Sequence, residues 1–275
     1  MRALTSVMLA ALFGASAAGA VDQNGLKALI TAQDSKGYEA VGRLDIGTTS
    51  FCTGALIEPD VVLTAAHCLF DPESKARIGD HEIAFRAGWR NGRAAATRQV
   101  RKSVIHPHYR YTGPQGADHV AEDVALLALS APIQNNSVTP FETEQRPRKG
   151  AEVGVVSYAK DRADRPALQE VCHILGRPAG TLVMSCDVDF GSSGAPVFVI
   201  GEDGAPRIVS VVSAKAEVRG RQVALGTGLD GSALLALRDA LEPGRAASGE
   251  SGTPRIRRLT IDSPPSGGGA KFIRP

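Results

Sequence analysis

Three short segments of the chain carry side chains that could perform nucleophilic catalysis. They are Leu63–Cys68, which contains His67, Asp123–Leu127, and Gly191–Pro196, which contains Ser193. A serine hydroxyl is a weak nucleophile at neutral pH, so it needs a neighbouring base such as imidazole to accept its proton. Taken singly, each segment also has an ordinary explanation: a core histidine, an aspartate in a turn and a glycine-serine loop. The segments are therefore informative only as a set.

The elements that must position these residues are mostly short strands. Between about Tyr38 and Thr227, β-rich runs alternate with turn residues, a pattern typical of an all-β barrel or sandwich. Ser232–Leu241 is predicted to be the clearest helix, because Ser232 can cap its start and Pro243 follows its end. The expected strands are 40–46, 55–57, 61–63, 82–87, 124–129, 152–158, 182–188, 196–200 and 208–213.

The first twenty residues (1–20) are predicted to be a signal peptide. Arg2 supplies a positive start, Val7–Phe13 is an apolar run, and Ala18–Ala20 is a small-residue cleavage site. The segment is shorter than the roughly 20 apolar residues that a spanning helix needs, and we expect no stable membrane insertion. The mature chain is then secreted or periplasmic. Residues 21–37 are expected to be a lead or a short pro-segment.

Residues 244–275 differ in composition from the rest of the chain. Gly, Ser and Pro are frequent there, and six basic residues stand against two acidic ones. Such a segment has too little apolar surface to offset the entropy of ordering, so it is predicted to be a flexible basic tail. The tail accounts for the basic character of the chain, and nothing indicates a nucleic-acid-binding domain. Weak electrostatic attachment of the protein to a surface through this basic tail is an alternative that the sequence leaves open.

The four cysteines form two sequence-local pairs, Cys52 with Cys68 and Cys172 with Cys186. An exported chain folds where disulfides persist, but four cysteines allow three connectivities and the sequence by itself does not choose among them. Metal binding is the competing interpretation. The sequence has no C-x-x-C element and no ligand cluster at zinc spacing, so no metal site is predicted.

Together and in this order, the three segments resemble the trypsin/chymotrypsin-like serine protease superfamily. The histidine motif T-A-A-H-C of that superfamily stands unaltered at Thr64–Cys68, and its D-[IV]-A-L-L motif stands at Asp123–Leu127. Its G-D-S-G-G-P motif is altered at Gly191–Pro196. The likeness runs over about residues 38–241. Further matching segments are Phe51–Ile57, Ile105–Tyr109 and Val209–Ser213.

The resemblance implies an all-β fold of two packed six-stranded antiparallel β-barrels with a C-terminal helix, over residues 38–243, with the break between barrels near 130–150. It implies a serine endopeptidase that forms an acyl-enzyme on Ser193, with His67 as general base and Asp123 orienting the imidazole. Protein or peptide substrates are the implied partners. A monomer is expected, and no metal or organic cofactor is required.

Two further features follow from the resemblance. Amides at the positions of Gly191 and Ser193 form the oxyanion hole of the superfamily, which stabilises the charged intermediate. Cys52 and Cys68 match its disulfide beside the histidine. The pair of Cys172 with Cys186 is less standard, and we expect it to bridge the strands that frame the specificity pocket.

Ser192 marks a departure from the superfamily pattern. Digestive members have an aspartate there, which pairs with the new N-terminus released when a zymogen is cut, and this chain also lacks an Ile-Val-Gly-Gly start. Some bacterial secreted members share this condition. We expect an enzyme that is active soon after export, unless residues 21–37 must first be removed. The alternative is an inactive protease-fold protein that binds without cutting, which the presence of all three candidate catalytic residues disfavours.

Substrate preference is weakly encoded. Asp187 stands six residues before the candidate nucleophile, where trypsin has the aspartate that favours Arg or Lys, and Asp189 is an equal candidate. Ser213 belongs to the strand that lines the substrate cleft in the superfamily. Lys215 follows it and could narrow the pocket or favour an acidic side chain. The alternative is that both aspartates only solvate a loop.

Overall fold

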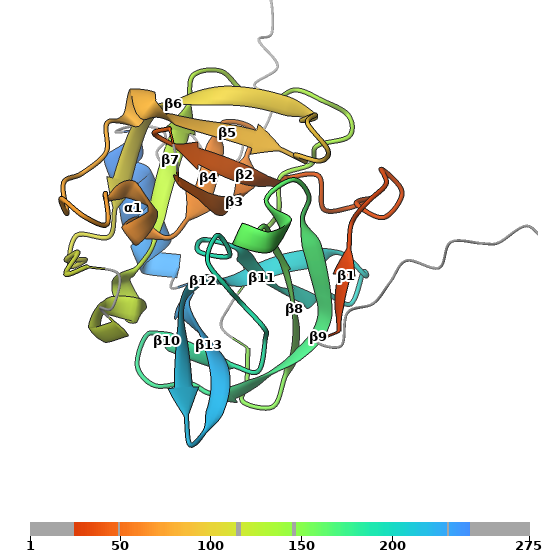
Figure 1. The fold of residues 1–275 in the computed structure, drawn as a ribbon, viewed down its shortest axis with the longest axis vertical. Helices are drawn as coiled ribbons and strands as arrows, with labels where there is room; N and C mark the ends of the chain where they lie inside the picture. The colour runs from red at the N-terminus through yellow and green to blue at the C-terminus, as the bar shows by residue number, and fades with distance from the viewer. Residues whose placement is uncertain (1–24, 49, 114–116, 145–146, 230, 243–275) are drawn as a thin grey trace, which may run out of the picture.

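In the described part of the chain, the regular elements are mostly antiparallel strands, which form two barrels packed against each other (Figure 1). The predicted signal peptide and the predicted basic tail lie outside the described residues. The computed structural model describes residues 25–48, 50–113, 117–144, 147–229 and 231–242.

The first barrel closes in the strand order β2-β3-β4-β7-β6-β5. Buried and partly buried residues alternate along β5, as expected for a strand with one face on a core. Strand β7 is instead buried along its whole length, because α1 packs against β6 and β7 from outside the barrel. The bounds are β2 (Val41–Ile46), β3 (Ser50–Glu58), β4 (Val61–Thr64), β5 (Ile83–Ala87), β6 (Ala96–Ile105) and β7 (Ala125–Leu129).

The second barrel closes because β8 pairs with both β9 and β11. Its strand order is β8-β9-β10-β13-β12-β11. The bounds are β8 (Glu152–Ser157), β9 (Ala167–Gly176), β10 (Thr181–Met184), β11 (Pro196–Ile200), β12 (Pro206–Val218) and β13 (Arg221–Gly228). Two closed six-stranded barrels confirm the predicted fold class.

The segment interpreted as a lead or short pro-segment, residues 21–37, takes part in the fold from its sixth residue on. Strand β1 (Leu26–Ala28) pairs with β9 at the edge of the second barrel. Leu29, the next residue, is fully buried. The described part of this segment is therefore packed against the barrel rather than separate from it.

The C-terminal helix α1 (Gly231–Leu241) begins one residue before the predicted start. Its buried residues are Leu234, Leu237 and Leu241, at helical spacing on one face. The Lys102 ammonium donates hydrogen bonds to carbonyls of the last turn at 2.7 and 2.8 Å, which satisfies acceptors left free at a helix end. No helix in the described part of the chain is long and apolar enough to cross a membrane.

Two disulfides and four short 3-10 helices complete the framework over the residues that the structure describes. Cys52 of β3 is bonded to Cys68, and Cys172 of β9 is bonded to Cys186, two residues after β10. Both sequence-local pairings are thereby confirmed. The 3-10 helices are η1 (Ala66–Leu69), η2 (Asp80–Glu82), η3 (Ala117–Glu122) and η4 (Lys160–Arg162).

Candidate active site

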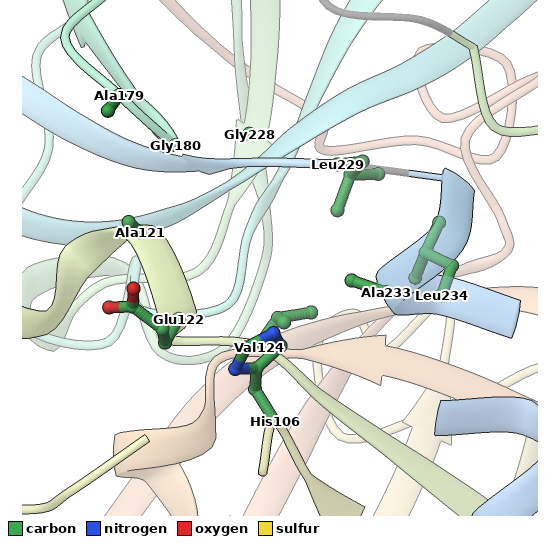
Figure 2. Close-up of a pocket in the computed structure, with 10 residues that line it drawn as sticks. All are labelled: His106, Ala121, Glu122, Val124, Ala179, Gly180, Gly228, Leu229, Ala233 and Leu234. Carbon is green, nitrogen blue, oxygen red and sulfur yellow. The ribbon is translucent and has the colours of Figure 1, made fainter. Parts of the chain in front are cut away.

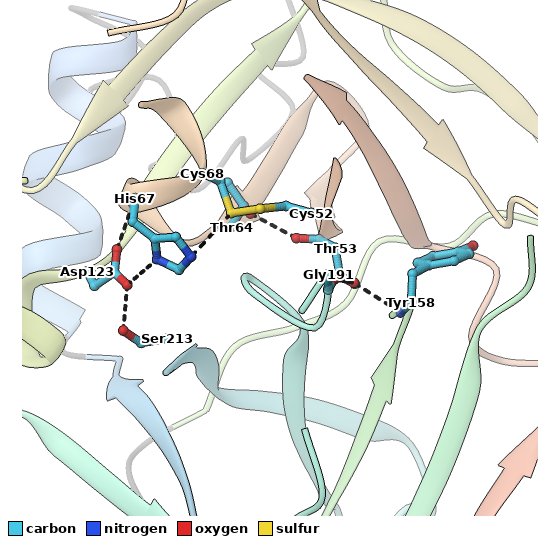
Figure 3. The surroundings of a disulfide bond; sticks show 9 residues. All are labelled: Cys52, Thr53, Thr64, His67, Cys68, Asp123, Tyr158, Gly191 and Ser213. Atoms are coloured by element: carbon cyan, nitrogen blue, oxygen red, sulfur yellow. Dashed lines mark hydrogen bonds and ion pairs between the residues drawn. A yellow bond between two sulfur atoms is a disulfide. The ribbon is translucent and has the colours of Figure 1, made fainter. Parts of the chain in front are cut away.

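His67 and Asp123 meet where two neighbouring strands of the first barrel come together. His67 lies in η1 just after β4, and Asp123 lies just before β7, which pairs antiparallel with β4. The imidazole Nδ1 is 2.6 Å from Asp123 Oδ2, and the His67 backbone N–H donates to Oδ1 at 2.8 Å (Figure 3). Because a carboxylate only accepts, Nδ1 carries the proton, and Nε2 of the neutral ring is left as the acceptor.

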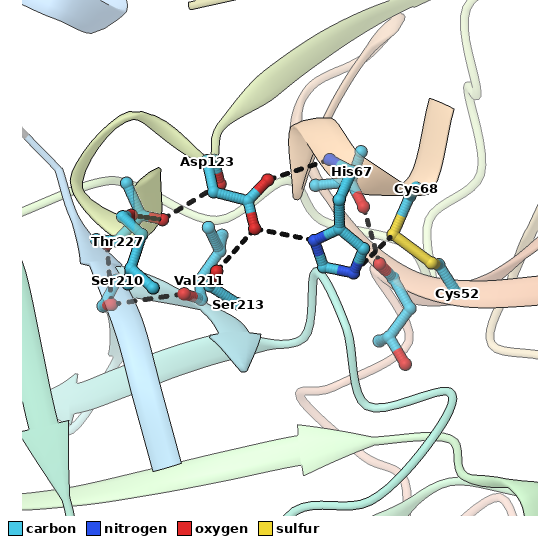
Figure 4. Close-up of polar contacts among 11 residues, drawn as sticks. Cys52, His67, Cys68, Asp123, Ser210, Val211, Ser213 and Thr227 are labelled. Carbon is cyan, nitrogen blue, oxygen red and sulfur yellow. Dashed lines mark hydrogen bonds and ion pairs between the residues drawn. A yellow bond between two sulfur atoms is a disulfide. The ribbon is translucent and has the colours of Figure 1, made fainter. Parts of the chain in front are cut away.

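The Asp123 carboxylate is buried, with 3% of the residue exposed, and it is held from the second barrel as well. The Ser213 hydroxyl of β12 donates to Oδ2, and the Thr227 hydroxyl of β13 lies 2.9 Å from the Asp123 carbonyl oxygen (Figure 4). The carboxylate thus accepts three hydrogen bonds in a buried site, where each is stronger than in water. The pair is fixed by both barrels.

Two opposing effects set the basicity of His67. Burial lowers the pKa of the imidazole, whereas the charge of Asp123 and the hydrogen bond from Nδ1 raise it. The net result is a His67 pKa above its ordinary value of 6.5. The carboxylate therefore favours the imidazolium form, which a general base must adopt after it has taken a proton.

Ser193 lies in a turn between β10 and β11 that we call the serine loop, residues 189–195. Four successive carbonyl groups of this loop accept hydrogen bonds, so their directions are fixed. The bonds are Lys160 N–H to Phe190 O (2.8 Å), Thr53 Oγ1 to Gly191 O (2.8 Å), Ala195 N–H to Ser192 O (2.9 Å) and Thr53 N–H to Ser193 O (2.9 Å).

Two alternate amides of the serine loop are left without acceptors. The N–H groups of Ser192 and Gly194 are bonded within the protein. Those of Gly191 and Ser193 have no hydrogen-bond acceptor among the described residues. In a planar trans peptide the N–H points opposite to the C=O, so fixing the carbonyls also fixes these two donors. A pair of free amides in one turn is suited to binding an anionic oxygen.

Close backbone packing brings the serine loop to the histidine segment. Gly194 has φ +75°, and a Cβ there would lie 2.1 Å from Thr64 Oγ1 and 2.3 Å from the Thr53 carbonyl oxygen. Glycine is therefore required for this approach. The Ser193 hydroxyl nevertheless makes no hydrogen bond to His67 among the described residues. Catalytic hydrogen bonds are often long in unliganded enzymes and tighten when substrate binds.

The four candidate specificity residues have different surroundings. Ser213 is buried and bonded to the candidate catalytic aspartate, a contact that sequence reasoning missed. Asp189 is exposed, and its carboxylate accepts the N–H of Phe190, so it stabilises the local turn. Asp187 is partly buried, with its N–H bonded to a side-chain oxygen of Gln169. Lys215 is exposed on β12.

A cavity and a group of potential metal ligands lie close to the His67–Asp123 pair. A cavity of about 250 Å³ lies between η3, the β9–β10 turn and the start of α1 (Figure 2). Glu122 and Val124 line it, but neither His67 nor Ser193 does. In the described part of the chain, the one group of three close potential metal ligands is His67 with the cysteines of the first disulfide, whose sulfurs are bonded to each other.

Two closed barrels, with a partly buried histidine–aspartate pair and a serine followed by glycine, are features of the class of trypsin-like serine proteases. The family model Trypsin matches residues 31–225. The chain therefore belongs to the trypsin family.

The curated relatives are similar over a limited part of their length. Chymotrypsin-like elastase family member 1 of Macaca fascicularis is 33% identical over 89 residues, 31% of this chain and 29% of the relative. Kallikrein-10 of Homo sapiens is 35% identical over 89 residues, 32% of this chain and 30% of the relative. The chain thus matches less than a third of the length of either relative.

Solved structures extend the similarity over most of the fold. A Glu endopeptidase in complex with MPD has a TM-score of 0.63 at 16% identity, covering 80% of this chain and 98% of that chain. The thermostable serine protease AL20 from an extremophilic microorganism has a TM-score of 0.60 at 17% identity, covering 74% and 97%. At such identities the similarity concerns the fold alone.

Proposed function

We propose that this trypsin-family chain is a secreted or periplasmic serine endopeptidase with Ser193 as its nucleophile. One observation carries the proposal: His67, paired with the buried Asp123 and with an accepting Nε2, stands beside a serine loop that has two unbonded amides. A base, its orienting carboxylate and two donors for an oxyanion are the groups that acyl transfer requires.

In the proposed reaction, Ser193 Oγ attacks the carbonyl carbon of the scissile peptide and its proton passes to His67 Nε2. Asp123 stabilises the imidazolium that forms. The carbonyl oxygen becomes an oxyanion that accepts hydrogen bonds from the amides of Gly191 and Ser193, each worth about 3–4 kcal/mol by analogy with a known protease donor.

The C–N bond of the intermediate then breaks, and His67 returns its proton to the leaving amine. An acyl ester remains on Ser193 Oγ. Water attacks this ester while His67 accepts a proton of the water; the bond between the acyl carbon and Ser193 Oγ then breaks, His67 returns the proton to Oγ, and the acid product leaves.

Location and partners are part of the same proposal. Two disulfides favour an oxidising compartment, in agreement with the predicted signal peptide of residues 1–20. Protein or peptide chains are the proposed substrates of a monomer. Asp187 and Lys215 give opposite expectations for the side chain before the cleaved bond, basic and acidic respectively, and a peptide library distinguishes them.

The test is labelling of the mature protein with a fluorophosphonate probe, which reacts with an activated serine. We expect labelling of the wild type and none of Ser193→Ala, followed by cleavage of library peptides. An inactive binding protein is the second candidate, favoured by the missing hydrogen bond between Ser193 and His67. Folded wild-type protein that neither labels nor cleaves would support that candidate and refute the endopeptidase.

A further inference from the structure

Thr53 makes three hydrogen bonds that join the two barrels. It is fully buried in β3. Its backbone N–H donates to Ser193 O at 2.9 Å, and its carbonyl accepts the Thr64 hydroxyl at 2.9 Å. Its own hydroxyl donates to Gly191 O at 2.8 Å and accepts the Tyr158 N–H at 3.1 Å (Figure 3). One side chain therefore ties the end of β8 to the serine loop.

These bonds hold the Gly191–Ser192 and Ser193–Gly194 peptide groups, which lie on either side of the peptide that carries the Ser193 N–H. A hydroxyl has one proton, and the Thr53 hydroxyl donates it to Gly191 O. This bond holds the Gly191 carbonyl in one orientation. The backbone N–H of Thr53 fixes the Ser193 carbonyl in the same way. The Gly191 N–H belongs to the same peptide as the Phe190 carbonyl, and the Ser193 N–H to the same peptide as the Ser192 carbonyl; both carbonyls accept backbone N–H groups. Thr53 holds the next peptide along the chain in each case, so a change of the turn that reoriented either amide by moving Gly191 or Ser193 would break a buried bond, at the cost of unsatisfied polar groups.

Ser192 supplies a second anchor at the same place. Its hydroxyl is fully buried, accepts the Asp189 N–H at 3.3 Å, and lies 3.3 Å from both Ser157 Oγ and the Tyr158 carbonyl. In digestive members of the superfamily this position holds an aspartate that needs a cationic partner. A neutral hydroxyl bonded to the end of β8 needs no buried counter-charge.

We propose that Thr53 is a positioning residue, which holds the Gly191 and Ser193 amides ready for an oxyanion without an ion pair from a new N-terminus. Ser192 is the second anchor of the same device. The inference rests on the proposed function, since it assigns the regulation of that site: the anion-binding turn is preformed in the folded chain and does not await cleavage.

The test compares Thr53→Val, which keeps the shape but loses the hydroxyl, with Thr53→Ser, which keeps the hydroxyl. Ser35→Ala is the matched control, because the Ser35 hydroxyl is also buried, donates one bond (to Thr31 O, 3.1 Å) and accepts one (from Arg90, 2.8 Å) outside the serine loop. Melting curves establish that each variant is folded. Substrate is a library peptide cleaved by the wild type.

We expect kcat of Thr53→Val to fall roughly ten- to a hundredfold, somewhat less than loss of a whole oxyanion donor, with KM changed by less than about threefold. Thr53→Ser should recover most of kcat, and Ser35→Ala should match the wild type. A folded Thr53→Val with wild-type kcat would overturn the proposal. So would a Thr53→Ser as slow as Thr53→Val, since the hydroxyl would then not be the cause.

Hydrogen exchange of residues 189–195, followed by mass spectrometry, separates this inference from the proposed function. Faster exchange in Thr53→Val, but not in Thr53→Ser or Ser35→Ala, would support positioning even if the wild type cleaved nothing. Unchanged exchange in all variants would refute positioning, whether or not Ser193→Ala abolishes cleavage.

Discussion

Replacing Asp123 by Asn tests the candidate active site most directly, because the change keeps the shape and removes the charge. The carboxylate accepts three hydrogen bonds, from the His67 backbone, from His67 Nδ1 and from Ser213. An asparagine has one accepting oxygen and one donating NH2 group. Whichever way the amide is turned, its NH2 faces a group that now donates.

The cost follows from this geometry. With the NH2 group toward Nδ1, the imidazole must move its proton to Nε2, and Nε2 can then no longer accept the proton of Ser193. With the oxygen toward Nδ1, the NH2 group opposes the His67 backbone N–H. In the protease that serves as the general template for this triad, the same substitution lowers kcat about 10⁴-fold. At about 1.36 kcal/mol per tenfold change, that is roughly 5.5 kcal/mol of transition-state stabilisation.

Steady-state cleavage of a library peptide, with the fluorophosphonate labelling rate as a second readout, measures the effect of Asp123→Asn. Ser213→Ala is the graded control, since it removes one of the three bonds but keeps the charge and the tautomer. A hydrogen bond to a charged group is worth about 1.5–3 kcal/mol, so kcat should fall roughly ten- to a hundredfold. A folded Asp123→Asn that stays within tenfold of the wild type would contradict the assigned His67–Asp123 pair, and so would a Ser213→Ala that is slower than Asp123→Asn.

Three further predictions concern the base and the serine loop. The base must be neutral, so kcat/KM should fall as pH drops through the raised His67 pKa, with its midpoint above 6.5; a midpoint well below 6.5 would contradict the assigned pair. The same raised pKa stabilises the folded state fully below about pH 6.5 and loses that contribution as pH rises through the folded pKa, which melting curves of the wild type and His67→Ala should show. Gly194→Ala would place a methyl group 2.3 Å from the Thr53 carbonyl oxygen, so we expect a lower melting temperature and no probe labelling; wild-type values for both would refute the close approach.

Much of the fold was predictable because its signals lie in short stretches of sequence. The strands and the C-terminal helix show in contiguous runs of residues, whereas the sequence by itself left three disulfide connectivities open, even though the bonded cysteines are only 16 and 14 residues apart. The motif around His67 and the one at Asp123 are likewise contiguous, so matching them to a family required no tertiary contact. The segment 25–37 was less clear, since its strand has only three residues and gains order by pairing with β9.

By itself, the sequence of this protein determined the class of barrel, the order of the motifs and the residue types available for acyl transfer. Only the tertiary structure decided what holds them: Ser213 reaches Asp123 across 90 residues, and Thr53 reaches Gly191 across 138. Such bonds form when closed barrels bring distant backbone together, and no local spacing encodes them. Asp189 shows that a local contact can also need the structure. Its carboxylate accepts the N–H of the next residue, Phe190, so its role in the turn became clear only from the turn itself.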